Sequence, residues 1–351
     1  MMRITGLKTN RLRNPLGFAM TDKPGLSWIV ESEGAKRQAA ARVEVSTDDG
    51  FRNIIFDSGK REDIDSISYR PDIEIKPRTR YYWRVCVWGD DGSVAESETA
   101  WFETSKMNEP WQAKWITPDF DPSFHPVVFS DIRLEKNVAS ARAYVCGLGL
   151  YEMSVNGEKT GDDYLSPGLV AYDKWIPYQV YDITGSLKKG VNSIEFMLGN
   201  GWYKGRYGLN RKELFRYGDR FAVICEIHVV YDDGSTGIFY TDASWKAKKS
   251  KVLDSSIFDG EIYDDTFCDD TVYPVSIIDL DTKKLEPRRS PVIKIKERIK
   301  PVEIIHTPAG ETVIDMGQNM VGWLEFANRA PKGSEIMLQF GEVLQDGNFY
   351  R

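Results

Sequence analysis

Apolar and polar residues alternate with a period of two along much of this chain, in runs that are short. Dipeptides typical of tight turns separate these runs: Asp49-Gly50, Asp91-Gly92, Asn156-Gly157, Asp233-Gly234 and Lys332-Gly333. A period of two places successive side chains on opposite faces of a strand, and Asn-Gly or Asp-Gly favours a hairpin turn. Helical periodicity is nearly absent. The sequence therefore predicts an all-β chain built as tandem β-sandwiches.

The balance of charge limits the partners of this chain. Its 351 residues include 46 Lys plus Arg and 53 Asp plus Glu, which gives a net charge of -7. General binding to nucleic acid or to an anionic membrane needs a basic face, so we expect neither partner. The chain also has 10 Trp and 17 Tyr. Such rings can stack on sugars, although large β-sandwiches use the same residues in their cores.

The sequence shows no mark of export, membrane insertion or a histidine-based metal site. The first ten residues, MMRITGLKTN, lack the apolar segment of a signal peptide, and no run is long enough to span a membrane. We therefore expect a cytoplasmic protein. The cysteines and histidines are too scattered for a metal site or a catalytic triad. They are Cys86, Cys146, Cys225, Cys268, His125, His228 and His306.

Changes in composition predict three domains. Residues 1–106 look like a fibronectin type III-like sandwich, in which Tyr81 stands where the tyrosine corner of immunoglobulin-like folds ties back to upstream backbone. Residues 107–290 form a second, jelly-roll-like sandwich. Residues 291–351 begin with a proline-punctuated basic connection and hold the start of a third sandwich.

Several ordered motifs make the resemblance to one family specific. They are YEMSVNGEKTGDDYLSPG, YDKWIPYQVYDIT, VNSIEFMLGNGWYKGR, FDGEIYD and DMGQNMVGWLEF. With them the chain resembles the amino-terminal half of a bacterial α-L-rhamnosidase of glycoside hydrolase family 78. The resemblance implies that the parent enzyme hydrolyses terminal α-L-rhamnosides with inversion.

The resemblance also implies that an (α/α)6 catalytic barrel follows the β domains. This sequence contains no long helix-periodic segment that could build such a barrel. No catalytic residue can therefore be assigned here, and we expect the chain alone to be inactive. Its expected partners are the parent's own catalytic barrel and rhamnose-containing oligosaccharides or glycosides.

The glycine-rich run LGNGWYKGRYGLN is the strongest candidate for a binding loop. Its glycines miss the spacing of a dinucleotide fingerprint by one residue. We expect Trp202 and Tyr203 to offer stacking faces, and Asn200 and Arg206 to bond sugar hydroxyls. The alternative is structural: Trp202 closes the end of the sandwich, and Arg206 pairs with a nearby Asp.

The run GDDYLSPG supplies adjacent carboxylates, Asp162 and Asp163. Hard cations such as Ca²⁺ prefer oxygen ligands, and the resemblance implies that some related sandwiches bind rhamnose with the help of calcium. Ca²⁺ is therefore the candidate ion for Asp162 and Asp163. We expect no cofactor to be required. The alternative is a solvated turn. The acidic run FDGEIYDD is interpreted as an exposed loop.

Three hypotheses about function follow. In the leading one, the chain supports the barrel of a rhamnosidase and binds rhamnose-containing glycans. In the second, the β domains are a scaffold without a ligand. In the third, carboxylates of this chain hydrolyse glycosides unaided, and turnover of an aryl rhamnoside would distinguish it from the others.

Overall fold

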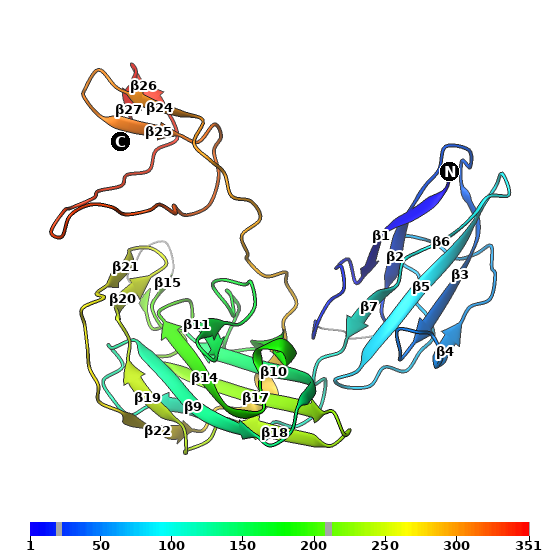
Figure 1. Cartoon of the computed structure of the whole chain (residues 1–351), viewed down its shortest axis with the longest axis horizontal. Coiled ribbons are helices and arrows are strands. Elements are labelled where there is room, and N and C mark those ends of the chain that lie inside the picture. The colour runs from blue at the N-terminus through cyan, green and yellow to red at the C-terminus, as the bar shows by residue number, and fades with distance from the viewer. Residues whose placement is uncertain (19–22, 208–212, 351) are drawn as a thin grey trace. The chain divides into compact units, whose positions relative to one another are not determined.

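The computed structural model describes residues 1–18, 23–207 and 213–350 and confirms the all-β prediction (Figure 1). In this part of the chain, the only helical elements are two single turns of 3₁₀ helix, η1 (Thr184–Ser186) and η2 (Thr282–Lys284). No helix among these residues is long and apolar enough to cross a membrane.

The first domain packs a five-stranded sheet and a two-stranded sheet around one core. The large sheet has the order β4-β3-β5-β6, and β7 also pairs with β5. Its strands are β3 (Gln38–Ser46), β4 (Ile54–Asp57), β5 (Arg80–Gly89), β6 (Val94–Glu96) and β7 (Ala100–Glu103). The second sheet pairs β1 (Arg3–Thr9) with β2 (Leu26–Glu31).

Strand β5 shows how the sequence pattern becomes a core. Tyr81, Trp83 and Val85 point into the apolar cluster between the sheets, and the residues between them are partly exposed. The Tyr81 hydroxyl accepts a hydrogen bond from the backbone N of Lys76 at 2.8 Å. The predicted tyrosine corner is therefore present.

The second domain forms one continuous hydrogen-bonded path that is bent into a sandwich. The path runs β12-β11-β14-β9-β19-β22-β8-β17-β10-β13-β23, and β18 also pairs with β17. Strand β22 joins the two halves, because it pairs with β19 on one side and β8 on the other. The strands on this path and beside it are β8 (Trp115–Pro118), β9 (Pro126–Leu134), β10 (Val138–Leu148), β11 (Leu150–Val155), β12 (Glu158–Lys159), β13 (Ile176–Asp182), β14 (Gly190–Gly199), β17 (Ala222–Tyr231), β18 (Thr236–Tyr240), β19 (Lys246–Lys249), β22 (Tyr273–Ile278) and β23 (Leu285–Pro287).

Two apolar clusters stabilise this domain. The larger lies between the halves of the sandwich and includes Val145 and Phe196. The smaller, which we call the aromatic layer, has as its buried aromatic members Trp115, Tyr144, Tyr172 and Tyr178. Successive side chains of β10 point to opposite faces of the sheet, which explains why there are two clusters. Val145 belongs to the larger cluster and its neighbour Tyr144 to the aromatic layer.

A buried charge fixes the segment that enters the second domain. Glu226 on β17 is fully buried and binds the ammonium of Lys106 at 2.5 Å. Its other oxygen accepts from the backbone N of Gln112 and, at 3.0 Å, of Ala113. His228 also lies 3.0 Å from Glu226. The segment between the domains is therefore held by one carboxylate.

Residues 295–351 form a separate compact unit with little regular structure. It contains two short ladders, β24 (Glu303–His306) with β25 (Thr312–Asp315) and β26 (Leu344–Gln345) with β27 (Asn348–Phe349). Large apolar side chains are exposed along this unit, including Val321, Met337 and Phe340.

Candidate functional site

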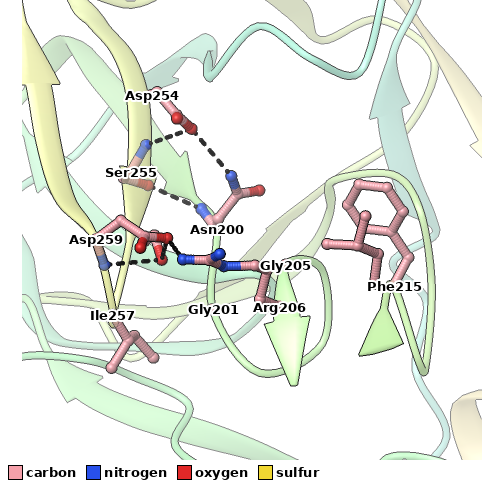
Figure 2. Close-up of a pocket in the computed structure, with 11 residues that line it drawn as sticks. Asn200, Gly201, Gly205, Arg206, Phe215, Asp254, Ser255, Ile257 and Asp259 are labelled. Carbon is pink, nitrogen blue, oxygen red and sulfur yellow. Dashed lines mark hydrogen bonds and ion pairs between the residues drawn. The ribbon is translucent and has the colours of Figure 1, made fainter. Parts of the chain in front are cut away.

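A pocket of ≈ 270 Å³ lies where the glycine-rich loop meets two small hairpins (Figure 2). One hairpin pairs β15 (Arg206–Tyr207) with β16 (Glu213–Leu214), and the other pairs β20 (Val252–Ser256) with β21 (Gly260–Tyr263). The lining residues are Asn200, Gly201, Gly205, Arg206, Leu214, Phe215, Asp254, Ser255, Ser256, Ile257 and Asp259.

Two glycines shape the loop. Gly205 has a φ of +137°, and a Cβ there would lie 2.7 Å from the carbonyl oxygen of Gly201. A Cβ on Gly201 would lie 2.7 Å from Cγ of Leu150. The backbone N of Gly201 donates to the carbonyl of Lys204 at 2.7 Å. A side chain on Gly205 would force the turn to open, and one on Gly201 would displace Leu150.

Asn200 is held on three sides. Its backbone N donates to Oγ of Ser255 at 3.0 Å, and its side-chain amide approaches Oδ1 of Asp254 at 3.5 Å. The ammonium of Lys204 donates to Oδ1 of Asn200 at 2.8 Å. These contacts fix the orientation of the amide before any ligand arrives, which lowers the ordering cost of binding.

Two buried basic residues, His125 and Lys204, contact the pocket residues Ser255 and Asn200. Burial, with the charge of Lys204 adding to it, lowers the pKa of His125 to about 4, so the imidazole is neutral at pH 7. His125 Nε2 lies 2.8 Å from Oγ of Ser255. Burial also lowers the pKa of Lys204 to about 8, although the charges of Asp254, Asp219 and Asp121 oppose the shift.

Arg206 crosses the pocket and forms an ion pair with Asp259 at the tip of the other hairpin (Figure 2). This is the pairing that the structural alternative for Arg206 expected. The ion pair ties the two hairpins together. A guanidinium carries five N–H donors, so Arg206 can still donate to a ligand.

The structure brings Asn200 and Arg206 to the pocket but leaves Trp202 and Tyr203 out of its lining. Both rings are half-buried and pack against the aromatic layer. The Tyr203 ring meets that of Tyr172 edge-on, with centroids 5.5 Å apart, and burial raises the pKa of its hydroxyl. In this geometry the two rings help to cover a core.

Asp162 and Asp163 have separate partners. Asp163 is buried and accepts hydrogen bonds from the hydroxyls of Ser166 and, at 2.9 Å, Tyr181. Asp162 is exposed and pairs with Lys294 at 3.0 Å. In the described ranges no three His, Cys, Asp or Glu residues are arranged to hold a metal. Ca²⁺ takes six to eight oxygens, and these two carboxylates supply only part of such a set. Calcium binding at Asp162 and Asp163 stays a prediction.

These two neighbours make a matched pair of variants. We expect Asp163→Ala to lower the free energy of unfolding by about 2–3 kcal/mol, because two buried hydroxyls lose their acceptor. Asp162→Ala should change it by less than about 1 kcal/mol, since its ion pair is exposed. Urea unfolding with and without a chelator measures both effects. Equal losses that vanish in chelator would instead indicate a shared calcium site.

Sequence reasoning missed most of the pocket. The sequence indicates Asp259 only as part of an acidic loop, and it gives no functional signal for Leu214 or Phe215. Their local signal is weak: the polar run Asp254-Ser255-Ser256 before the turn at Asp259-Gly260 resembles any exposed hairpin. Their common role depends on which hairpins meet in space.

Comparison with known proteins gives consistent matches along the chain. Three family models match successive segments: "Rha78A-like, N-terminal immunoglobulin domain" at residues 4–108, "Alpha-L-rhamnosidase N-terminal domain" at 136–297 and "Bacterial alpha-L-rhamnosidase concanavalin-like domain" at 305–351. A curated α-L-rhamnosidase of Formosa agariphila is 30% identical over 95% of this chain, which spans 40% of that relative.

Solved structures agree with these matches. An α-L-rhamnosidase from Aspergillus terreus superposes with a TM-score of 0.85 at 26% identity, over 100% of this chain and 42% of that one. The α-L-rhamnosidase from Dictyoglumus thermophilum gives a TM-score of 0.74 at 30% identity, over 90% of this chain and 38% of its own. The chain thus spans about two fifths of the relatives that it matches.

Proposed function

This chain belongs to the bacterial α-L-rhamnosidase family, of whose members it matches the amino-terminal domains, and on that premise we propose that it is the non-catalytic β region of an enzyme that hydrolyses terminal α-L-rhamnosides. Its second domain, we further propose, binds rhamnose-containing glycans in the pocket beside Asn200. This role adds to its support of the catalytic barrel.

The composition of the pocket carries the proposal. Asn200, Asp254, Ser255 and Arg206 offer amide, carboxylate, hydroxyl and guanidinium groups around one hollow. Sugar hydroxyls both donate and accept hydrogen bonds, so a site with both kinds of partner suits them. The volume of ≈ 270 Å³ is slightly below the usual range of drug-sized sites and suits a single sugar ring.

Calorimetric titration with L-rhamnose tests the binding role. We expect a Kd on the order of 0.1–1 mM, or roughly 4–5.5 kcal/mol. Asn200→Ala should weaken binding at least about tenfold, because the amide held by Lys204 and Asp254 is lost. Asn137→Ala, an exposed residue of the same domain, is the matched control. A parallel titration in chelator shows whether Ca²⁺ takes part.

A pure scaffold is the second candidate, and two observations favour it. Trp202 and Tyr203 pack against the aromatic layer, and the guanidinium of Arg206 already has a carboxylate partner. This hypothesis predicts no heat of binding for L-rhamnose with a fully folded protein.

The purified 351-residue chain is expected to release no nitrophenol from an aryl α-L-rhamnoside. An inverting glycosidase needs a carboxylic acid and a carboxylate base on either side of the bond. In the pocket, Asp259 is paired with Arg206, and Asp254 accepts a hydrogen bond from the backbone N of Ser255 at 2.9 Å. A full-length rhamnosidase is the positive control. Turnover that persists through purification would restore the hypothesis of an autonomous hydrolase.

A further inference from the structure

A second pocket, of ≈ 250 Å³, lies in the second domain where β8 leads into β9. We call it the β8–β9 pocket, because most of its residues come from these strands and the loop between them. The lining residues are Thr117, Pro118, Phe120, Pro122, Phe124, Pro126, Arg220 and Phe221. In the part of the chain that the structure describes, none of them lines the pocket beside Asn200. The two pockets are therefore distinct.

Three phenylalanine rings give the β8–β9 pocket apolar surface. Phe221 is 2% exposed, whereas Phe120 and Phe124 are partly exposed. The ring of Phe120 meets that of Tyr273 edge-on, with centroids 4.9 Å apart, and the ammonium of Lys249 lies 4.2 Å from the centroid of Phe124. Rings that are already held in place cost little to order when a ligand binds. A flat aromatic ligand gains from packing edge-to-face or offset on such rings.

Polar partners for a ligand are few in this pocket. The hydroxyl of Thr117 donates to the carbonyl of Phe221 at 2.7 Å, so its hydrogen is already used. Among the described lining residues, Arg220 has the only charged side chain. Its ion pair with the neighbouring Asp219 is long, at 3.5 Å, and both side chains are exposed. A guanidinium has several N–H donors, so Arg220 can also bind an anion.

A second cation lies behind the apolar surface. The buried ammonium of Lys204 is 4.1 Å from the centroid of the Phe221 ring. The nearby carboxylate of Asp121 does not line the pocket and accepts a hydrogen bond within its own turn, from the backbone N of Ser123 at 2.8 Å. The β8–β9 pocket therefore suits a ligand that is apolar over most of its surface and carries one negative group.

We propose that the β8–β9 pocket binds small aromatic carboxylates. The ring of the ligand packs on Phe120 and Phe124, and its carboxylate accepts hydrogen bonds from Arg220, whose planar group matches a carboxylate well. A sugar acid suits this pocket less, because its hydroxyls lose water and find few partners among the rings and prolines. This inference goes beyond sugar binding and does not depend on it.

Titration of the 351-residue chain, followed by ligand-observed NMR, tests the proposal with three probes. We expect trans-cinnamate to bind with a Kd on the order of 1 mM. Cinnamamide has the same ring without the charge and should bind about two- to fivefold more weakly, the range for an exposed ion pair. D-glucuronate keeps the carboxylate but lacks the aromatic ring, and it should bind at least about tenfold more weakly than cinnamate.

Two variants separate the contributions of the charge and the ring. Arg220→Gln should reduce the affinity for cinnamate to that for cinnamamide and leave cinnamamide unaffected. Phe124→Leu should weaken both ligands, because the ring contact is common to them. Arg133→Gln and Phe258→Leu are the matched controls, since both residues are exposed in the same domain and line neither pocket.

Each outcome decides the proposal. No binding of cinnamate to folded protein would overturn it, and equal affinities for cinnamate and cinnamamide would overturn the role of Arg220. Cinnamate binding that is unchanged in both Arg220→Gln and Phe124→Leu, or that L-rhamnose displaces, would place the ligand outside the β8–β9 pocket. D-glucuronate that binds as tightly as cinnamate and is weakened by Arg220→Gln would overturn the class of ligand. Thermal melts show that each variant keeps its fold.

Discussion

Replacing Glu226 with alanine is expected to lower the free energy of unfolding by about 3–5 kcal/mol, the range for removing one partner of a buried ion pair. The change leaves the ammonium of Lys106 buried without its carboxylate. It also removes the acceptor of the backbone N–H groups of Gln112 and Ala113. Urea unfolding followed by tryptophan fluorescence measures the loss.

Glu135→Ala is the matched control for this prediction. Glu135 also pairs with a cation, Arg133, but both side chains are largely exposed. Exposed pairs contribute at most about 1 kcal/mol, so this variant should unfold almost as the original protein does. A loss below about 1 kcal/mol for Glu226→Ala would show that water replaces the carboxylate at the junction.

Acid should reproduce part of the effect. Burial raises the pKa of Glu226, but hydrogen bonds from His228, Lys106 and Ala113 outweigh it and bring the value to about 2. A carboxylate whose pKa is lowered by folding stabilises the protein above its unfolded value, near 4.5, and this contribution is lost as the pH falls toward 2. The pH dependence of unfolding between these values should be shallower in Glu226→Ala.

Limited digestion with trypsin is expected to remove residues 295–351 first and leave a fragment of about residues 1–294. Isolated two-stranded ladders are marginally stable, and those of this unit contain two to four residues in each strand. Its lysines and arginines, among them Arg298 and Arg329, therefore lie on backbone that opens easily. Mass spectrometry of the early fragments identifies the cuts. Early cleavage within residues 115–285 would contradict this prediction.

The sequence predicted the strands of the first two domains well because their signal is local, but the alternating runs on either side of Lys332-Gly333 form no strand. The alternation along β5 and the spacing to Tyr81 each lie within about ten residues, and both are seen in the structure. The pocket was predicted only in part. Asn200 and Arg206 stand on one loop, but Ser255 reaches them through the pairing of a hairpin some 50 residues away. No local pattern encodes that meeting.

Trp202 illustrates a second limit. A tryptophan on a glycine-rich loop has the same local sequence whether it faces a ligand or covers a core. Its place is decided by partners that the loop does not contain, namely the aromatic layer formed by residues such as Tyr144 and Tyr178. Hydrophobic burial is not directional, so composition alone could not distinguish the two arrangements.

The two hairpins of the pocket have a consequence for how this domain can evolve. Among the described strands, β15 pairs with β16 and β20 with β21, and neither hairpin belongs to the long hydrogen-bonded path of the sandwich. Substitutions in the hairpins therefore leave the ladders that hold the domain unchanged. Descendants of one ancestral gene can exchange these tips and change the lining of the pocket while inheriting the same sandwich.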